Sequence, residues 1–428
     1  MKKVLATTII MALSAVICNA QSGTNSPYSQ YGIGLLSDQS QGFNRGMNGV
    51  GLGLRKGNVV NTLNPASYSA IDSLTMIFDV GVSGQITSFK EGGKKVNANN
   101  AGFEYAVGSF RLLPSVGIGF GILPYSSIGY NYYSSKELDV TGETIQDTYS
   151  GSGGIHQAFV GAGWRVAKPL SIGINLAYIW GTYEKRISST SSTSSTNSLA
   201  KSYSGTISNY NLEVGLQWEQ EISSTDKLIW GATVGIGHNL GCELDCKINE
   251  YNTLSGNTDT RSYVVENGLS LPMSYGVGMS WNHAEKVLVA LDMSTQQWGK
   301  NDYPFYDSQA DNYRLTSGLL KDRYKVNLGA DFVPNPLSRH LLSRVHYRMG
   351  VGYSTPYYKI NGADGPKELS ASFGFGLPLQ NRHNNRSFLN VSAQWVHSSA
   401  NQLITENTFR INLGLTFNER WFMKWKIE

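Results

Sequence analysis

The chain has 428 residues and a formal net charge of +4, and it is rich in glycine (47), tyrosine (24) and tryptophan (9) but has only 12 prolines. The near balance of acidic and basic residues gives no reason to expect a nucleic-acid partner. Three cysteines are too few for the disulfide-dense scaffolds that stabilise small secreted domains.

The first 20 residues have the pattern of an export signal. Two lysines precede the apolar run 4–17, and Cys18-Asn19-Ala20 supplies small residues ahead of a cleavage site before Gln21. A lipoprotein signal that uses Cys18 is the alternative, but Ile17 is bulkier than that cleavage site accepts. We therefore expect residues 1–20 to be removed during export to the cell outer membrane.

Residues 21–71 lack the alternation of a strand and are crowded with glycine. If this segment were free in water, it would expose the apolar side chains of Tyr28, Tyr31, Ile33, Leu35, Leu36 and Phe43. We expect a compact plug, folded inside a barrel, with Asn64, Pro65 and Ala66 near its end. A flexible periplasmic tail is the alternative.

From residue 72 onward, apolar residues alternate with small or polar ones. Every second residue from Leu170 to Trp180, for example, is apolar. No stretch after the signal approaches the ~18 apolar residues of a spanning helix, whereas a closed barrel also satisfies its backbone groups in lipid. The pattern predicts an all-β fold, in which residues 72–428 form a transmembrane antiparallel barrel of about 14 strands that contacts outer-membrane lipid.

The predicted strands number fourteen, an even number as in single-chain bacterial barrels. Short connections, such as 113–114 and 167–169, alternate with long ones, such as 188–199 and 300–319, which places the short turns in the periplasm. The predicted strands are 72–89, 98–112, 114–133, 144–166, 169–187, 200–221, 227–248, 260–281, 285–299, 320–334, 342–355, 367–378, 386–398 and 406–426.

The third predicted strand contains Gly117, Gly119, Gly121 and Pro124. Proline cannot donate to the ladder, and strand glycines mark bends. We expect a bent and locally unpaired wall that could open sideways from the lumen into lipid. An ordinary bulge near the periplasmic rim is the alternative.

Charged residues also occur on the face that carries small and polar side chains, and we expect them to line the lumen. They could form ion pairs that fix the wall and hold the plug, or they could form a polar lining that rejects some solutes. These residues are Asp79, Glu104, Arg165, Glu213, Asp292, Lys325, Asp331, Arg344, Arg348 and Arg410.

The residues that could carry chemistry do not form a site. In an extended strand, His238, Cys242 and Cys246 would spread over about 26 Å, too far to share a metal ion. A turn at 243–245 would allow a disulfide between the two cysteines, and unpaired thiols are the alternative. The seven histidines share no motif with a nucleophile or base. We expect no enzyme activity, no metal and no cofactor.

Several segments resemble the FadL-type outer-membrane transporters for hydrophobic compounds. The glycine-rich run 46–51, followed by Asn64, Pro65 and Ala66, looks like the N-terminal signature of that family. Later segments are similar to its strands, and the segments 25–32 and 415–422 resemble its Bacteroidota branch. The later segments are Asp292–Trp298, Tyr347–Tyr353 with Thr355 and Pro356, and Gly374–Pro378.

The resemblance implies passive uptake of a hydrophobic small molecule, a fatty acid or another lipid-like or aromatic compound, with a gating plug and lateral release at the kinked third strand. It also implies insertion by the barrel assembly machinery. The chain ends in Lys426-Ile427-Glu428 rather than phenylalanine and lacks an apolar helical external loop, which weakens the case for a fatty acid.

The alternative function is that of a subunit or shuttle of an outer-membrane secretion or assembly complex, which would bind a protein partner rather than transport a solute. An apolar lumen pocket would favour transport. A filled lumen with a large apolar loop surface would favour a protein partner.

Overall fold

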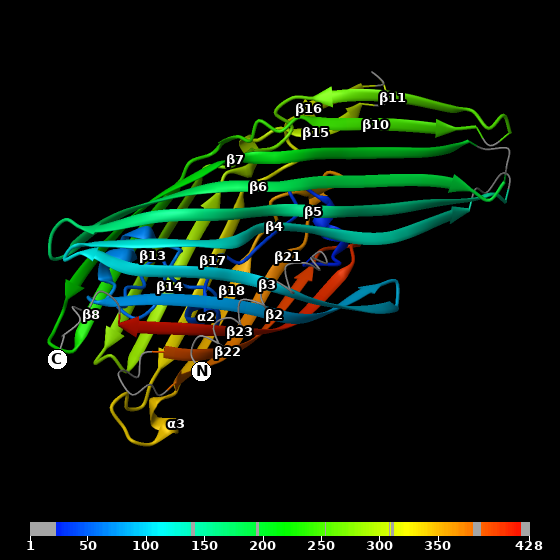
Figure 1. Ribbon diagram of the computed structural model, residues 1–428. Coiled ribbons are helices and arrows are strands. Elements are labelled where there is room, and N and C mark those ends of the chain that lie inside the picture. Colours follow the sequence, from blue (N-terminus) through cyan, green and yellow to red (C-terminus); the bar gives the residue numbers. More distant parts are fainter. Residues whose placement is uncertain are drawn as a thin grey trace, which may run out of the picture.

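The chain forms a barrel of strands around its own N-terminal segment (Figure 1). This computed structural model describes residues 23–137, 142–193, 197–252, 254–307, 309, 312–379 and 387–420. The predicted signal peptide and the last eight residues lie outside the described part. Among the helices that are described, none is long and apolar enough to cross a membrane.

Fourteen antiparallel strands make the wall, and the pairing of the first with the last closes the ring. Thr75 pairs with Arg420 and Lys90 with Thr405, so the contact runs along the full length of both strands. The wall strands are β2 (Thr75–Glu91), β3 (Lys94–Leu113), β4 (Val116–Glu137), β5 (Thr144–Arg165), β6 (Leu170–Ser191), β7 (Ser198–Glu221), β8 (Asp226–Gly235), β13 (Ser274–His283), β14 (Val287–Gln296), β17 (Arg323–Phe332), β18 (His346–Ser354), β21 (Lys367–Leu379), β22 (Ser387–Ser399) and β23 (Thr405–Arg420).

The alternation in the sequence becomes an apolar outer face and a polar inner face. In β6, Ile172, Ile174, Leu176 and Tyr178 are exposed on the outside, and the residues between them are buried. Beyond residue 180 the outward positions become polar. A tilted strand crosses a bilayer with about 9–11 residues, so the remainder of this 22-residue strand extends beyond the apolar band.

The two ends of the barrel differ, as the alternation of short and long connections predicts. Short turns join the strands at one end, here the short-turn end, which faces the periplasm in bacterial barrels. At the other, long-strand end, β4 to β7 project outward (Figure 1). β10 (Leu244–Tyr251) pairs with the projecting part of β7, and β11 (Thr258–Val265) extends that sheet.

Two of the predicted strands were wrong in their extent. The range 227–248 contains β8, β9 (His238–Asn239) and the start of β10, and the range 260–281 contains parts of β11 and β13 and all of β12 (Ser270–Leu271). The part of β7 nearer the short-turn end pairs with β8, and the part nearer the long-strand end pairs with β10. The chain therefore leaves the wall between β8 and β10.

The long connections are also more ordered than the sequence predicts. The range 188–199 includes the end of β6 and the start of β7, and the range 300–319 holds the hairpin of β15 (Tyr303–Asp307) and β16 (Asn312–Thr316). The remaining short elements are η3 (Trp298–Lys300), α3 (Leu341–Arg344), β19 (Lys359–Ile360) and β20 (Ala363–Asp364).

Residues 23–71, called the plug below, run through the lumen from the long-strand end toward the short-turn end. They form η1 (Pro27–Gln30), β1 (Leu35–Leu36), α2 (Gly42–Arg45) and η2 (Pro65–Ala70). The Ser26 hydroxyl donates to Glu406 near the long-strand end. At the other end, the Asn64 amide donates to the Leu216 carbonyl over 3.1 Å.

A row of wall glycines makes room for η2. Gly117, Gly163, Gly173 and Gly215 are direct cross-strand neighbours in β4, β5, β6 and β7. A Cβ on Gly117 would lie 1.9 Å from the Tyr68 carbonyl oxygen, and one on Gly173 would lie 2.3 Å from the Pro65 carbonyl carbon. Because no side chain fits there, the four glycines, here the glycine row, form a trough that matches the plug backbone.

Wall glycines also face the plug elsewhere around the ring. A Cβ on Gly231 of β8 would lie 1.9 Å from the Leu52 carbonyl oxygen, and Gly329 and Gly350 of β17 and β18 face Met47 at 2.6 and 2.5 Å. The wall therefore contacts the plug backbone on several sides.

We predict that Gly173→Ala displaces η2, because the new methyl group meets plug backbone rather than a flexible side chain. Overpacking of this kind costs about 1–3 kcal/mol. The folded barrel should lose its fast mobility on unheated gels at a lower temperature, and cells should become sensitive to large antibiotics. Gly84→Ala, which has no neighbour within 4 Å, is the matched control. Equal behaviour of the two variants would show that the trough does not seat the plug.

Candidate functional site

Basic side chains of the plug meet acidic side chains of the wall. Arg45 lies 2.8 Å from Glu104, and their side chains are only 3% and 14% exposed. Arg55 lies 3.3 Å from Glu219 of β7. Charges taken out of water are tolerated when they are paired and hydrogen-bonded. These contacts therefore fix the rotation and height of the plug within the ring.

Asp331 of β17 is the centre of the densest of these clusters. Its carboxylate lies 3.2 Å from the Lys56 ammonium, 2.9 Å from His346 Nδ1 and 3.1 Å from Arg348 Nε. Arg348 also donates to Asn390 over 2.7 Å, and its guanidinium lies 4.0 Å above the ring of the plug residue Phe43. A single wall carboxylate thus joins two neighbouring strands to the plug.

Asp292 of β14 contacts the plug through backbone groups. One of its oxygens accepts the Gly51 N–H at 2.6 Å and the Leu52 N–H at 3.0 Å. Three strands away along the wall, the Gln217 amide of β7 donates to the carbonyls of Leu52 and Leu54. The end of the glycine-rich run 46–51 and the residues after it are therefore bound by two strands of the wall.

Within the plug, Asp38 stays ionised. Burial alone would raise the pKa of this carboxyl group, but the charges of Lys325 and Arg45 and the hydrogen bonds from Ser40 lower the pKa to about 2. Because the pKa is lower in the folded than in the unfolded protein, the ionised carboxylate stabilises the fold. This contribution to the free energy of unfolding is fully present at neutral pH and is lost only as the pH falls toward 2.

The motif residues near the end of the plug have defined places. The Asn64 side chain accepts the Ala66 N–H at 3.1 Å, and Pro65 occupies the first turn of η2. A proline is suited to this position because its missing N–H would have no helical partner. The Asn64 amide also binds the Leu52 carbonyl over 2.9 Å. The motif therefore starts η2 and ties it to the glycine-rich run.

The other predicted lumen charges lie apart from these contacts. Asp79 accepts the hydroxyl of Tyr105, and Arg410 donates to Gln85. Arg344 is buried in α3, outside the wall, and Arg165 closes β5 at the short-turn end. Glu213 and Lys325 face a cavity that is described below.

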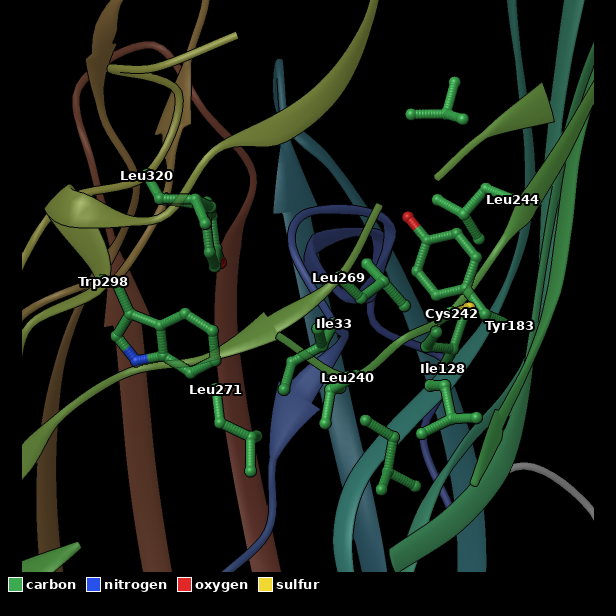
Figure 2. Packing of buried hydrophobic residues seen from close by; sticks show 14 of the residues in the cluster. Ile33, Ile128, Tyr183, Leu240, Cys242, Leu244, Leu269, Leu271, Trp298 and Leu320 are labelled. Carbon is green, nitrogen blue, oxygen red and sulfur yellow. The ribbon is translucent and has the colours of Figure 1, made fainter. Parts of the chain in front are cut away.

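Apolar packing closes the lumen toward the long-strand end. Tyr28 and Ile33 of the plug join the buried Ile128, Trp298 and Leu320 from the wall and the connecting segments in one hydrophobic cluster, here the lid cluster (Figure 2). Each large side chain that is fully buried contributes about 1.5–3 kcal/mol. The lid cluster therefore resists opening more strongly than a flexible loop would.

Lys185 of β6 connects this cluster to the plug. Its ammonium donates to the Gln30 carbonyl, to the Gly32 carbonyl over 3.1 Å and to the Tyr303 hydroxyl over 3.0 Å. It also lies 4.4 Å from the centre of the Tyr183 ring, at cation–π distance.

Cys242 and Cys246 lie in the lid cluster as buried, unpaired thiols. This arrangement corresponds to the open alternative of free thiols rather than a disulfide. Within the described part of the chain, no group of three or more histidine, cysteine, aspartate and glutamate side chains could hold a metal ion.

A cavity of about 240 Å³ lies between the plug and the wall, on the short-turn side of the lid cluster. Its lining is mixed, with Leu36, Leu123 and Phe159 on one side and charged groups elsewhere. The charged lining residues are Asp38, Glu213, Asp292, Arg323 and Lys325. The cavity is therefore amphipathic rather than apolar.

The wall is interrupted beside this cavity, where β3 and β4 separate. Their ladder ends at the pair Ala106 and Ile122, and a bulge follows between Pro124 and Ser126 in the pairing of β4 with β5. The interruption beyond Ala106 and Ile122 is called the seam below. Pro124 lies eight residues after the start of β4, about 26 Å along the strand, so this bulge is set back from the first residue of the strand.

The plug covers the freed edge of β4. Leu35 and Leu36 of β1 pair with Ser127 and Ser126. The Ser37 N–H donates to the Tyr125 carbonyl over 3.0 Å, and the Gln39 amide donates to the Pro124 carbonyl over 2.9 Å. A segment of the plug therefore replaces the missing wall partner.

The glycines of the third predicted strand have different neighbours. A Cβ on Gly117 or Gly119 would collide with the backbone or the ring of Tyr68, while one on Gly121 would collide with Ala106 and Val107 of β3. Gly117 and Gly119 therefore seat the plug, and the seam begins beyond them.

A family model matches residues 1–428, the whole chain, and its description is BamG. The chain belongs to the BamG family. No curated protein matches the chain.

The fold of this BamG-family chain is similar to solved outer-membrane barrels. A FadL homologue from Pseudomonas aeruginosa has a TM-score of 0.62 at 11% identity, with 90% of this chain and 99% of that chain covered. The toluene transporter TodX from P. putida has 0.61 at 14% identity, with 91% and 100% covered. The toluene transporter TbuX from Ralstonia pickettii has 0.61 at 12% identity, with 90% and 99% covered. The fold is thus a FadL-type barrel.

The sequence did not indicate which plug residues of this BamG-family protein bind the wall. Arg45, Arg55 and Lys56 are three cations in one glycine-rich segment, and this excess of positive charge opposite inward acidic residues was an available signal. Gly173 and Gly329 lie on the small or polar face of the alternation, and inward glycine at successive strands is itself a sign of close backbone approach.

We predict that Asp331→Asn destabilises the barrel by about 3–5 kcal/mol, because it leaves the buried Arg348 guanidinium without its anion. The control is Asp364→Asn, which breaks the more exposed pair with Lys321 (28% and 50% exposed) and should change little. Urea unfolding in lipid vesicles measures both. If Asp331→Asn unfolds at the same urea concentration as the parent protein, the cluster does not hold the plug.

Proposed function

We propose that this chain is a non-enzymatic barrel of the outer membrane that serves as a scaffold subunit of an assembly complex. The observation that carries the proposal is the closure of the lumen: plug backbone lies against wall backbone at the glycine row, and wall carboxylates bind the plug at Glu104, Asp292 and Asp331. A sealed barrel can act through its surfaces without passing a solute. The name of the BamG family also hints at an outer-membrane complex.

Two surfaces outside the apolar band would be available to a protein partner. The connection from β17 to β18 carries Leu337, Leu341 and Leu342, which are 92%, 51% and 72% exposed at the short-turn end. The projecting parts of β4 to β7 form the other surface, at the long-strand end. A filled lumen with exposed apolar connections is the combination expected for a partner-binding barrel.

A second candidate is plug-gated uptake of a hydrophobic small molecule, and the seam favours it. The seam lies next to the cavity, and the two-residue strand β1 covers it. If β1 detached, a solute could pass between β3 and β4 into the lipid. TodX and TbuX, which share this fold, are toluene transporters.

A disulfide that locks β1 to β4 separates the two functions. Leu36→Cys and Ser126→Cys place two thiols at directly paired positions, in a background where Cys242 and Cys246 are replaced by alanine. In cells depleted of the native protein, we expect the oxidised double variant to restore normal levels of outer-membrane barrels, because a scaffold does not need β1 to move. Immunoblots of outer-membrane fractions measure this.

The control is Leu36→Cys alone in the same background, which forms no cross-link. If the locked protein fails and the reducing agent rescues it, movement of β1 is required and the scaffold proposal is wrong. If depletion itself leaves barrel levels unchanged, the assembly role is also wrong.

For the second candidate, we predict that Pro124→Val slows uptake of radiolabelled toluene at unchanged protein abundance. Valine supplies the missing ladder donor and a side chain that favours strands, so it should help β3 and β4 to pair beyond Ile122. Ser135→Val, farther along β4, serves as control. Unchanged uptake would remove the support for a lateral route.

A further inference from the structure

The cavity between the plug and the wall contains one carboxylate that the protein leaves without a partner. Two basic residues line the cavity. Arg323 lies 3.7 Å from Glu368, and the charge of Lys325 lowers the pKa of Asp38 in the plug. Asp292 accepts two backbone N–H groups from the plug. By contrast, no residue in the described part of the chain donates a hydrogen bond to Glu213 or forms an ion pair with it.

Glu213 is half-buried, so its carboxyl group is partly withdrawn from water without a compensating partner, which is unfavourable. Wall acids elsewhere in the lumen, such as Glu104 and Asp331, face cations of the plug. Glu213 faces the cavity instead, at a place where the plug provides no cation.

An apolar wall begins one row above Glu213. Glu213 pairs across the sheet with Asn175, and the next inward residues on β6 and β5 are Ala177 and Phe159. Since adjacent strands lie about 4.8 Å apart and residues about 3.3 Å apart along a strand, Phe159, two strands and two residues away, is about 12 Å from Glu213 along the sheet. Leu123 and the plug residue Leu36 continue the apolar lining. The cavity thus has one end with a carboxyl group and one apolar end.

We propose that this cavity binds a small amphiphilic organic cation, with an ammonium group at Glu213 and an apolar body against Phe159, Leu123 and Leu36. The cavity volume of about 240 Å³ is many times the space that one water molecule needs. An amine of about eight to ten heavy atoms, such as an arylethylamine, fits this space. The proposal goes beyond the scaffold role and does not depend on it.

Three probes of matched shape and different charge test the proposal. They are 2-phenylethylamine, 2-phenylethanol and 3-phenylpropanoate, titrated calorimetrically into the purified full-length protein in detergent. We expect the amine to bind at least tenfold more tightly than the alcohol, and the carboxylate to bind most weakly. Glu213→Gln, which retains shape and removes the charge, should weaken the amine at least tenfold and leave the alcohol unchanged.

The control is Glu221→Gln, which alters an exposed carboxylate of the same strand that pairs with Lys227 outside the cavity lining. It should leave amine binding unchanged. Equal affinity of wild type and Glu213→Gln for the amine, or preference for the carboxylate probe, would overturn the proposal. Retained fast mobility on unheated gels shows that each variant is folded. Since the scaffold test measures barrel levels in cells, failure of one proposal can be told from failure of the other.

Discussion

The contact between plug backbone and wall backbone is the constraint on which the rest of the structure depends. Barrels of about eight strands can fill their interior with wall side chains, but wider barrels cannot. Here the plug supplies the missing volume, and it can approach the wall because Gly117, Gly163, Gly173 and Gly215 carry no side chains. Once η2 lies in this trough, the height and rotation of the plug are set, and every other plug residue meets a particular strand.

Electrostatic contacts make this position specific. Buried ion pairs add little net stability, because the cost of removing charges from water offsets their attraction. Their geometry, however, is restrictive: Asp331 accepts from Lys56, His346 and Arg348 at once, and Asp292 accepts two successive N–H groups of the plug. A plug rotated by one strand would leave several buried charges unpaired. The charges therefore select one arrangement, while apolar burial in the lid cluster supplies stability.

The cavity and the seam arise where the plug leaves one side of the barrel for another. β1 follows the edge of β4, whereas Leu52 is bound by Asp292 of β14 and Gln217 of β7. Between these contacts the plug leaves the cavity of about 240 Å³, and Glu213 lacks a partner in the described structure. The seam lies beside this space because β3 and β4 separate beyond Ala106 and Ile122. The two proposed functions thus differ in one physical requirement: only the gated channel needs β1 to detach from β4.

The sequence alone was sufficient for the fold. Alternation with a period of two is a property of each strand, so the fourteen-stranded barrel, its apolar outer band and the inward position of Asp331 and Arg348 could be predicted strand by strand. The boundaries near residues 235 and 274 could not, because β7 changes partner from β8 to β10 within one continuous alternation. Only the tertiary structure showed that Lys56 meets Asp331, that Gly117 and Gly173 share a row, and that β1 covers the edge of β4. These contacts join residues far apart in the chain, and they depend on strand register and on closure of the ring, which no local pattern of side chains determines.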